Sequence, residues 1–146
     1  MAEQATERMT VDSSPEECFN VAVDVEQYPK WAADIKAVTV NSRDEQDRPV
    51  EVTFRAGAFG RSTNYTLEYD YSEAPKVLAW RQLDGDITKR LDGSYQFEST
   101  RTGATTVTYV LTIELKVPLP GFIKKRAQGR IMYTALEELK ARVEAQ

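Results

Sequence analysis

The stretch from Ile35 to Leu115 constrains the fold more than any other feature of the sequence, because strand-like segments recur there between turn signals. Their spacing is typical of an antiparallel meander, in which each strand pairs with the next along the chain. The strands are expected at Ile35–Asn41, Val50–Ala56, Arg61–Tyr71, Lys76–Leu83, Ile87–Ser99 and Thr105–Val117. An alternating segment from Thr6 to Asp12 predicts a further strand before the meander. The sequence therefore predicts a seven-stranded antiparallel sheet, and a sheet of that size rarely stays open and flat.

Helix signals stand on both sides of the meander. Ser14–Glu17 is a capping box with proline at the first helical position, and a second short helix is expected over Val25–Ala33. After Pro118–Gly121 one long helix is expected, ending near Ala145. About 23 residues at about 1.5 Å each give it a length of roughly 35 Å, enough to cross the sheet. Its apolar stripe consists of Phe122, Gly129, Met132, Leu136, Leu139 and Val143.

These elements predict an α+β fold in which the curved sheet wraps around the C-terminal helix. One helix cannot fill the concave side of a curled sheet, and the two short helices after the first strand can close only one end. Gly57, Gly60 and Gly93 permit sharp bends inside or beside strands. A pocket should therefore remain between helix and sheet. Gly129, in the helix interior, is either neutral, packed closely against a strand, or a source of room for a ligand.

The composition excludes several classes of function. The chain has 146 residues, which suits a single domain over 1–146, and its net charge of −4 argues against nucleic-acid binding. Histidine is absent and Cys18 is the only cysteine, which excludes Ser-His-Asp and Cys-His nucleophile pairs and thiolate zinc clusters. There is no phosphate-cradling glycine motif, so no metal and no organic cofactor are expected. A membrane span of about 18 apolar residues and a signal peptide are both missing, so we expect a cytoplasmic protein.

The segment after the first helix resembles a known family. Asp24 and Tyr28–Trp31 match the pattern D-x-x-x-Y-P-x-W of the START-like, or SRPBCC, superfamily of polyketide cyclases and dehydrases. Thr105–Tyr109, Val117–Phe122 and Ala135–Lys140 are similar to the same family. The resemblance covers nearly the entire chain and implies the helix-grip fold, with element order β-α-α-β6-α. Its members bind lipids, sterols, polyketides, plant hormones or quinones, and a minority are aromatases and cyclases.

Aromatic residues recur on the strands that should line the curled sheet. Rings with a polar tip suit an apolar pocket with a few hydrogen-bonding groups, although each ring can also simply pack the core. A one-residue slip in register would turn any of them to the other face. The residues expected to contact a ligand are Phe54, Tyr65, Leu67, Tyr69, Trp80, Tyr95, Phe97 and Tyr109 from the sheet and Gly129, Met132 and Leu136 from the helix.

Charged strand residues receive no catalytic role. The carboxylates of Glu68, Asp70 and Glu98 alternate with the aromatic positions and should therefore face solvent. Three strand arginines either bind an anionic group of a ligand or lie on the solvated outer face. They are Arg55, Arg81 and Arg90.

The pocket entrance is expected at Phe59, Leu119 and Phe122. Leu119, Phe122 and Ile123 stand beside the cations 124–126, which resembles an apolar tip with a cationic collar. Such a tip can contact an anionic membrane transiently or gate the pocket; the alternative is that its apolar residues only anchor the helix.

Three functions remain open. The first is binding or carriage of an apolar or amphipathic small molecule, such as a lipid, a quinone or a polyketide-like compound. The second is an enzyme of the aromatase/cyclase type that works without histidine and needs an acid, a base or a bound water at the pocket wall. The third is a stress-related or toxin-like interaction protein, which should expose a large apolar patch.

Overall fold

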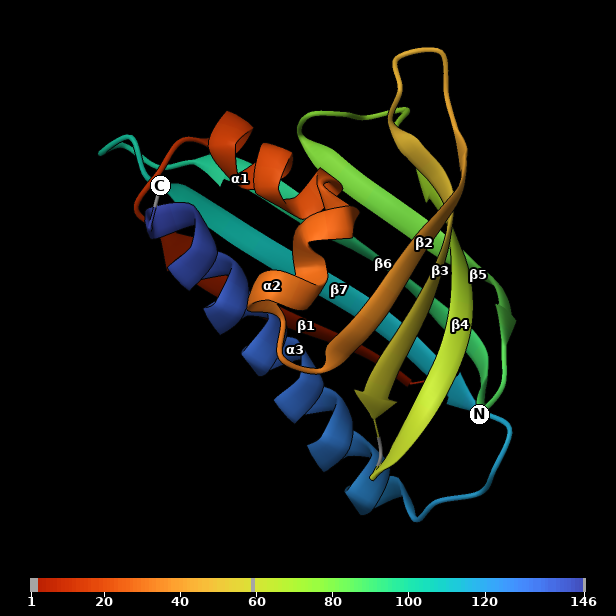
Figure 1. The fold of residues 1–146 in the computed structure, drawn as a ribbon. Coiled ribbons are helices and arrows are strands. Elements are labelled where there is room, and N and C mark those ends of the chain that lie inside the picture. The colour runs from red at the N-terminus through yellow and green to blue at the C-terminus, as the bar shows by residue number, and fades with distance from the viewer. Residues whose placement is uncertain (1–2, 59, 146) are drawn as a thin grey trace.

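The computed structural model describes residues 3–58 and 60–145, which form a curved sheet wrapped around a long helix (Figure 1). The strands are β1 (Glu3–Val11), β2 (Ile35–Arg43), β3 (Pro49–Ala58), β4 (Arg61–Asp70), β5 (Val77–Gly85), β6 (Thr88–Ser99) and β7 (Thr105–Leu115). The helices are α1 (Pro15–Val23), the 3-10 turn η1 (Val25–Gln27), α2 (Tyr28–Trp31) and α3 (Gly121–Glu144). The strand order is β1-β7-β6-β5-β4-β3-β2, so the meander is continuous and β1 adds to its last strand. The predicted α+β architecture is confirmed.

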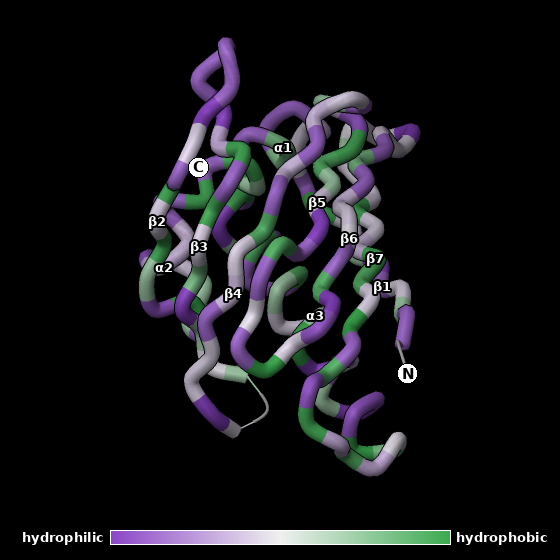
Figure 2. The backbone as a smooth tube through the Cα atoms, turned by 90° about the vertical axis from the view of Figure 1, so that its right-hand side faces the viewer, coloured by the Kyte–Doolittle hydropathy of each residue, from purple (hydrophilic) through white to green (hydrophobic). Residues whose placement is uncertain are grey.

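Alternation along the strands decides which side chains face the helix. In β7, Thr105, Val107, Tyr109, Leu111 and Ile113 are buried, while the residues between them are half-buried. Figure 2 shows the same alternation of hydrophobic and hydrophilic residues along other strands. The sheet also carries irregularities in register between β2 and β3, between β4 and β5, and between β6 and β7. Such irregularities bend strands, which helps the sheet to curl around α3.

The short helices cover one end of the curled sheet (Figure 1). The Ser14 side chain accepts a hydrogen bond from the Glu17 amide at 3.3 Å, so the predicted Ser14 cap begins α1, while the Glu17 carboxylate accepts from the Ser13 hydroxyl. The helix expected over Val25–Ala33 is divided into η1 and α2. Pro29 lies at the start of α2 and has no amide hydrogen to donate, so a continuous helix cannot run through it.

Helix α3 packs on β1, β7 and α1. Met132, Leu136, Leu139 and Val143 are each at most 1% exposed and form the contact face. Gln128 is also buried, and its Nε2 donates to the carbonyls of Glu3 at 3.0 Å and Leu111 at 2.9 Å. These two bonds join the helix to both strands at the edge of the sheet, so α3 is fixed where it crosses β1 and β7.

Candidate functional site

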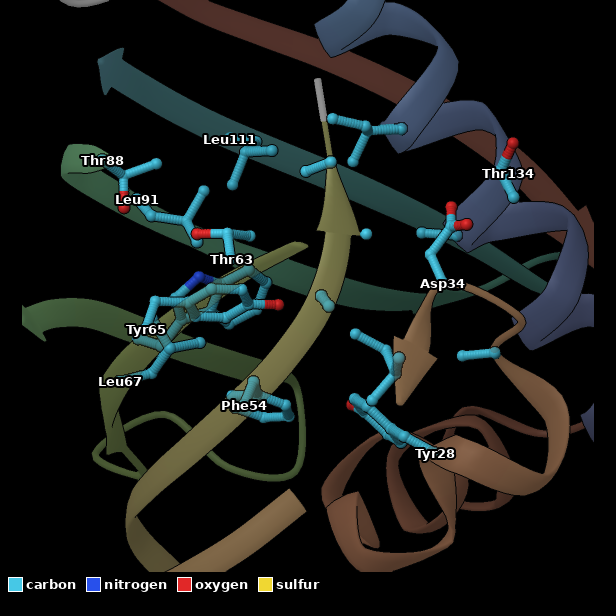
Figure 3. Close-up of a pocket in the computed structure, with 18 of the residues that line it drawn as sticks. Tyr28, Asp34, Phe54, Thr63, Tyr65, Leu67, Thr88, Leu91, Leu111 and Thr134 are labelled. Atoms are coloured by element: carbon cyan, nitrogen blue, oxygen red, sulfur yellow. The ribbon is translucent and has the colours of Figure 1, made fainter. Parts of the chain in front are cut away.

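A cavity of about 170 Å³ lies between the concave face of the sheet and α3. Figure 3 shows residues from the strands, the α2–β2 connection and α3 around it. Most of the wall is apolar or aromatic. Seven of the residues that we expected to contact a ligand line it: Phe54, Tyr65, Leu67, Tyr69, Trp80, Tyr95 and Tyr109. Their position in the wall is a structural fact, and ligand contact stays a prediction.

The aromatic rings of the wall contact one another across neighbouring strands. Phe54 and Tyr65 stack with ring centroids 5.3 Å apart, and Tyr95 lies 4.5 Å from Tyr109 and 5.4 Å from Trp80. Contacts of this kind stabilise the rings beyond the area that they bury. The wall therefore contains two aromatic clusters, one that includes Phe54 and Tyr65 and one that includes Trp80, Tyr95 and Tyr109.

Four expected contact residues lie outside the wall. Phe97 shares a sheet face with Tyr95 but lies further along β6, where it meets Phe19 of α1 with centroids 6.1 Å apart. On α3, the cavity is lined by Ile131, Thr134, Ala135 and Glu138, and not by Gly129, Met132 or Leu136. The most apolar stripe of the helix packs directly on the sheet and α1, because that contact excludes water completely. The neighbouring, more polar stripe is left to face the cavity.

Of the three residues expected at the entrance, two lie outside the cavity wall. Leu119 is 37% exposed and Phe122 is 73% exposed, and neither lines the cavity. Phe59 lies outside the described residues, although Gly57 and Ala58 at the end of β3 do line the cavity. Among the described residues, Gly57 and Ala58 thus bring the end of β3 into the cavity wall, whereas Leu119 and Phe122 are exposed outside it.

Several residues that line the cavity were not predicted from the sequence. Tyr28 and Trp31 lie in the Y-P-x-W segment that carried the family resemblance, so that segment itself marked them. Leu111 and Ile113 follow Tyr109 in the alternation of β7, which was a usable signal. Asp34 gave no such signal, because a single acidic residue before a strand is usually solvated.

Burial keeps the cavity tyrosines protonated. Desolvation raises the pKa of Tyr28, Tyr65, Tyr69, Tyr95 and Tyr109 above the ordinary value. The Tyr28 hydroxyl donates to the Ala22 carbonyl. For Tyr95 and Tyr109, a smaller contribution comes from hydrogen bonding between their side chains, which lowers the pKa of Tyr95 and raises that of Tyr109. These groups can therefore serve as neutral hydrogen-bond donors and acceptors.

Charged side chains in the described wall are confined to Asp34 and Glu138. The three strand arginines lie on the exposed outer face of the sheet. Arg81 pairs with Glu68 at 2.7 Å, and Arg90 pairs with Asp92 at 2.6 Å. Arg55 contacts Ser62. None of these arginines reaches the cavity, so their outer-face interpretation holds.

A metal site, a reactive thiol and a membrane-spanning helix can each be looked for in the described residues. Among the described residues there is no group of three or more histidine, cysteine, aspartate or glutamate side chains that could hold a metal ion. Cys18 is buried, and desolvation raises the pKa of its thiol, which makes it a poor nucleophile. Within residues 3–58 and 60–145, no helix combines the length and apolar character needed to cross a membrane.

Known proteins share both the sequence pattern and the fold. Residues 2–144 match the family described as polyketide cyclase / dehydrase and lipid transport. A START superfamily protein from Mycobacterium smegmatis is 22% identical, with a TM-score of 0.91 and coverage of 97% of both chains. The aromatase/cyclase Zhui from Streptomyces sp. R1128 is 14% identical, with a TM-score of 0.85 over 99% of this chain and 94% of that one. No curated protein sequence matches the chain. The family match over almost the full length shows that the chain belongs to the polyketide cyclase/dehydrase and lipid transport family.

Proposed function

We propose that this protein binds or carries an apolar or amphipathic small molecule, of lipid, quinone or polyketide type, between the sheet and α3. The observation that carries the proposal is the aromatic cavity at the position where the sequence predicts a pocket. The family supports hydrophobic ligand binding in general terms. The volume of the cavity restricts the size of the ligand, since an engineered apolar cavity of about 150 Å³ holds benzene. A cavity of about 170 Å³ suits a compact ring system better than an extended acyl chain.

The first test is the mass of the intact protein under non-denaturing conditions, followed by identification of any compound that co-purifies. A stoichiometric ring-containing or lipid-like compound is the expected result. Ala135→Phe, which fills the cavity from α3, should abolish its retention, whereas Ala141→Phe on the exposed face of α3 should not. Equal retention by both variants would place the compound elsewhere and contradict the proposal.

An aromatase/cyclase-type enzyme is the second candidate. The observation in its favour is the pair of carboxylates, Asp34 and Glu138, in a wall that also holds protonated tyrosines. A carboxylate can remove a proton next to one ketone while a phenol donates to the oxygen of a second ketone of the same chain. The enolate carbon then bonds to the second carbonyl carbon, whose oxygen takes up a proton to become a hydroxyl. Loss of this hydroxyl as water, followed by enolisation of the remaining ketones, gives the aromatic ring. Incubation with a short poly-β-ketone should give an aromatic product, and Asp34→Asn should slow its formation. If the poly-β-ketone cyclises no faster with the protein than in buffer, the result would favour ligand carriage without catalysis.

Transient membrane contact would explain the exposed tip formed by the β7–α3 connection and the first turn of α3. Leu119, Phe122 and Ile123 are 37%, 73% and 43% exposed, and the exposed cations Lys125 and Arg126 follow them. Apolar residues beside cations suit an anionic lipid surface. Co-flotation with phosphatidylglycerol vesicles should exceed that with phosphatidylcholine vesicles, and Phe122→Ser should reduce it. Indifference to lipid charge would leave the tip as an interaction surface for another protein.

A further inference from the structure

The polar groups of the cavity are divided between two regions. One region, which we call the acidic rim, consists of Asp34, Thr134 and Glu138. The Ala33 amide donates to Glu138 Oε2 at 3.0 Å, which brings the α3 carboxylate beside the residue that precedes Asp34. Figure 3 shows Asp34 at the start of β2 and Thr134 on the facing turn of α3. Two acidic side chains from different elements therefore meet at the same side of the cavity.

The other region is the tyrosine wall formed by Tyr65, Tyr69, Tyr95 and Tyr109. Tyr65 and Tyr69 line the cavity from β4, and Tyr69 is only 7% exposed. Among the described residues, the buried side-chain atom without a hydrogen-bond partner is Trp31 Nε1, and Trp31 also lines the cavity. A buried donor without a partner costs free energy that a ligand oxygen can restore. Trp31 and the phenols of the wall therefore indicate where oxygen atoms of a ligand would bind.

Neither region contains a cation. Among the described lining residues there is no lysine and no arginine. The nearest cation along the chain to Asp34 is Lys36, and its Nζ donates to the Ala33 carbonyl at 3.0 Å, outside the cavity wall. An anionic head group would therefore lose its hydration without gaining an opposite charge, and it would face two carboxylates at the rim.

We propose that the cavity selects neutral or cationic ring compounds, whose amine or hydroxyl group binds at the acidic rim, and discriminates against carboxylates. The ring then lies on the tyrosine wall, where protonated phenols donate hydrogen bonds to ligand oxygens and the aromatic faces attract positive charge. This inference rests on the proposed binding function and narrows its ligand class. Free fatty acids and other carboxylates are disfavoured, and aromatic amines, phenols and neutral polyketide-like rings are favoured.

The test compares three probes with one ring skeleton, namely 2-naphthylmethylamine, 2-naphthol and 2-naphthoate, by calorimetric titration at neutral pH and low salt. The amine and the naphthol should bind, and the naphthoate should bind roughly tenfold more weakly or worse. Added sodium chloride should narrow the difference between amine and naphthoate, because salt screens charges at a partly exposed rim. The affinity of the neutral naphthol should stay unchanged.

Variants of the acidic rim test whether it causes the preference for the amine over the carboxylate. In Asp34→Asn/Glu138→Gln, which preserves shape, the affinity of the amine should fall and that of the naphthoate should rise, while Glu137→Gln on the exposed face of α3 should change neither. Equal affinities of the wild type for amine and naphthoate would overturn this inference and leave the binding function intact. Failure of all three probes to bind would overturn the inference together with the proposed role of the cavity.

Discussion

Gly93 of β6 lies beneath the ring of Trp80. A Cβ atom on Gly93 would approach the Val110 carbonyl oxygen to 2.5 Å and Trp80 Cζ2 to 2.8 Å. Real Cβ atoms do not come this close to other heavy atoms, so the absence of a side chain at Gly93 leaves room for the Trp80 ring of the cavity wall beside β6. Gly129 of α3 is different, because a Cβ there would meet nothing within 4 Å.

Gly93→Ala should therefore destabilise the fold by about 1–3 kcal/mol, because the added methyl group overpacks against backbone that cannot move freely. Urea unfolding followed by circular dichroism measures the change, and Trp80 fluorescence should shift as its ring is displaced. Gly129→Ala is the matched control. It should raise the free energy of unfolding by up to about 1 kcal/mol, because alanine favours the helix interior. Equal effects of the two substitutions would contradict this account.

At the scale of elements, the apolar contact face of α3 includes a buried polar anchor, Gln128. Gln128 is 2% exposed and donates to carbonyls of both β1 and β7. Gln128→Met keeps the length of the side chain and removes both hydrogen bonds, so we expect a loss of about 1–3 kcal/mol of stability. Lys125→Met, on the exposed side of α3, should change stability by less than about 0.5 kcal/mol. Denaturant midpoints of the two variants check the prediction.

The sequence predicted the elements better than it predicted which faces they use. The Ser14 cap of α1 and the alternation in β7 depend on local chemistry, and both appear as expected. The cavity-facing side of α3 did not follow from hydrophobicity, because the sheet and α1 take the most apolar stripe. Asp34 and Glu138 meet only through the tertiary fold, so no local pattern could have paired them.

At the scale of the whole molecule, the buried tyrosines connect stability to alkaline pH. Burial raises the pKa of Tyr28, Tyr65, Tyr69, Tyr95 and Tyr109 in the folded chain, so the unfolded chain releases their protons first as pH increases. The contribution of these tyrosines to the free energy of unfolding is fully present below about pH 10 and is lost as pH rises above that value. Each should remove about 1.4 kcal/mol per pH unit once the unfolded state has ionised.

Urea unfolding between about pH 8 and about pH 11, with tyrosinate absorbance as a second probe, measures this loss. Stability should be flat at the lower end and fall steeply at the upper end. Tyr69→Phe removes one of the five groups, so its slope above pH 10 should be smaller by about 1.4 kcal/mol per pH unit. Ionisation of all the tyrosines in the folded protein near pH 10 would contradict the prediction.

The hairpin of β5 and β6 is paired by backbone only over Val77–Trp80, opposite Gly93–Gln96. Nearer the turn, side chains bridge the two strands: Gln82 bonds with Thr88, and the Gln82 amide donates to Asp92. Side-chain bridges open at a lower free-energy cost than a continuous backbone ladder. In this region β5 keeps its pairing with β4 and β6 keeps its pairing with β7, so opening would separate only β5 from β6. The Gln82 amide, which donates to the Asp92 side chain, should thus exchange with deuterium faster than the backbone-paired amides of the β6–β7 ladder. Ile87, Thr88 and Leu91 line the cavity, so opening this part of the hairpin would enlarge the cavity. A ligand larger than the resting cavity could then bind without unfolding the rest of the sheet.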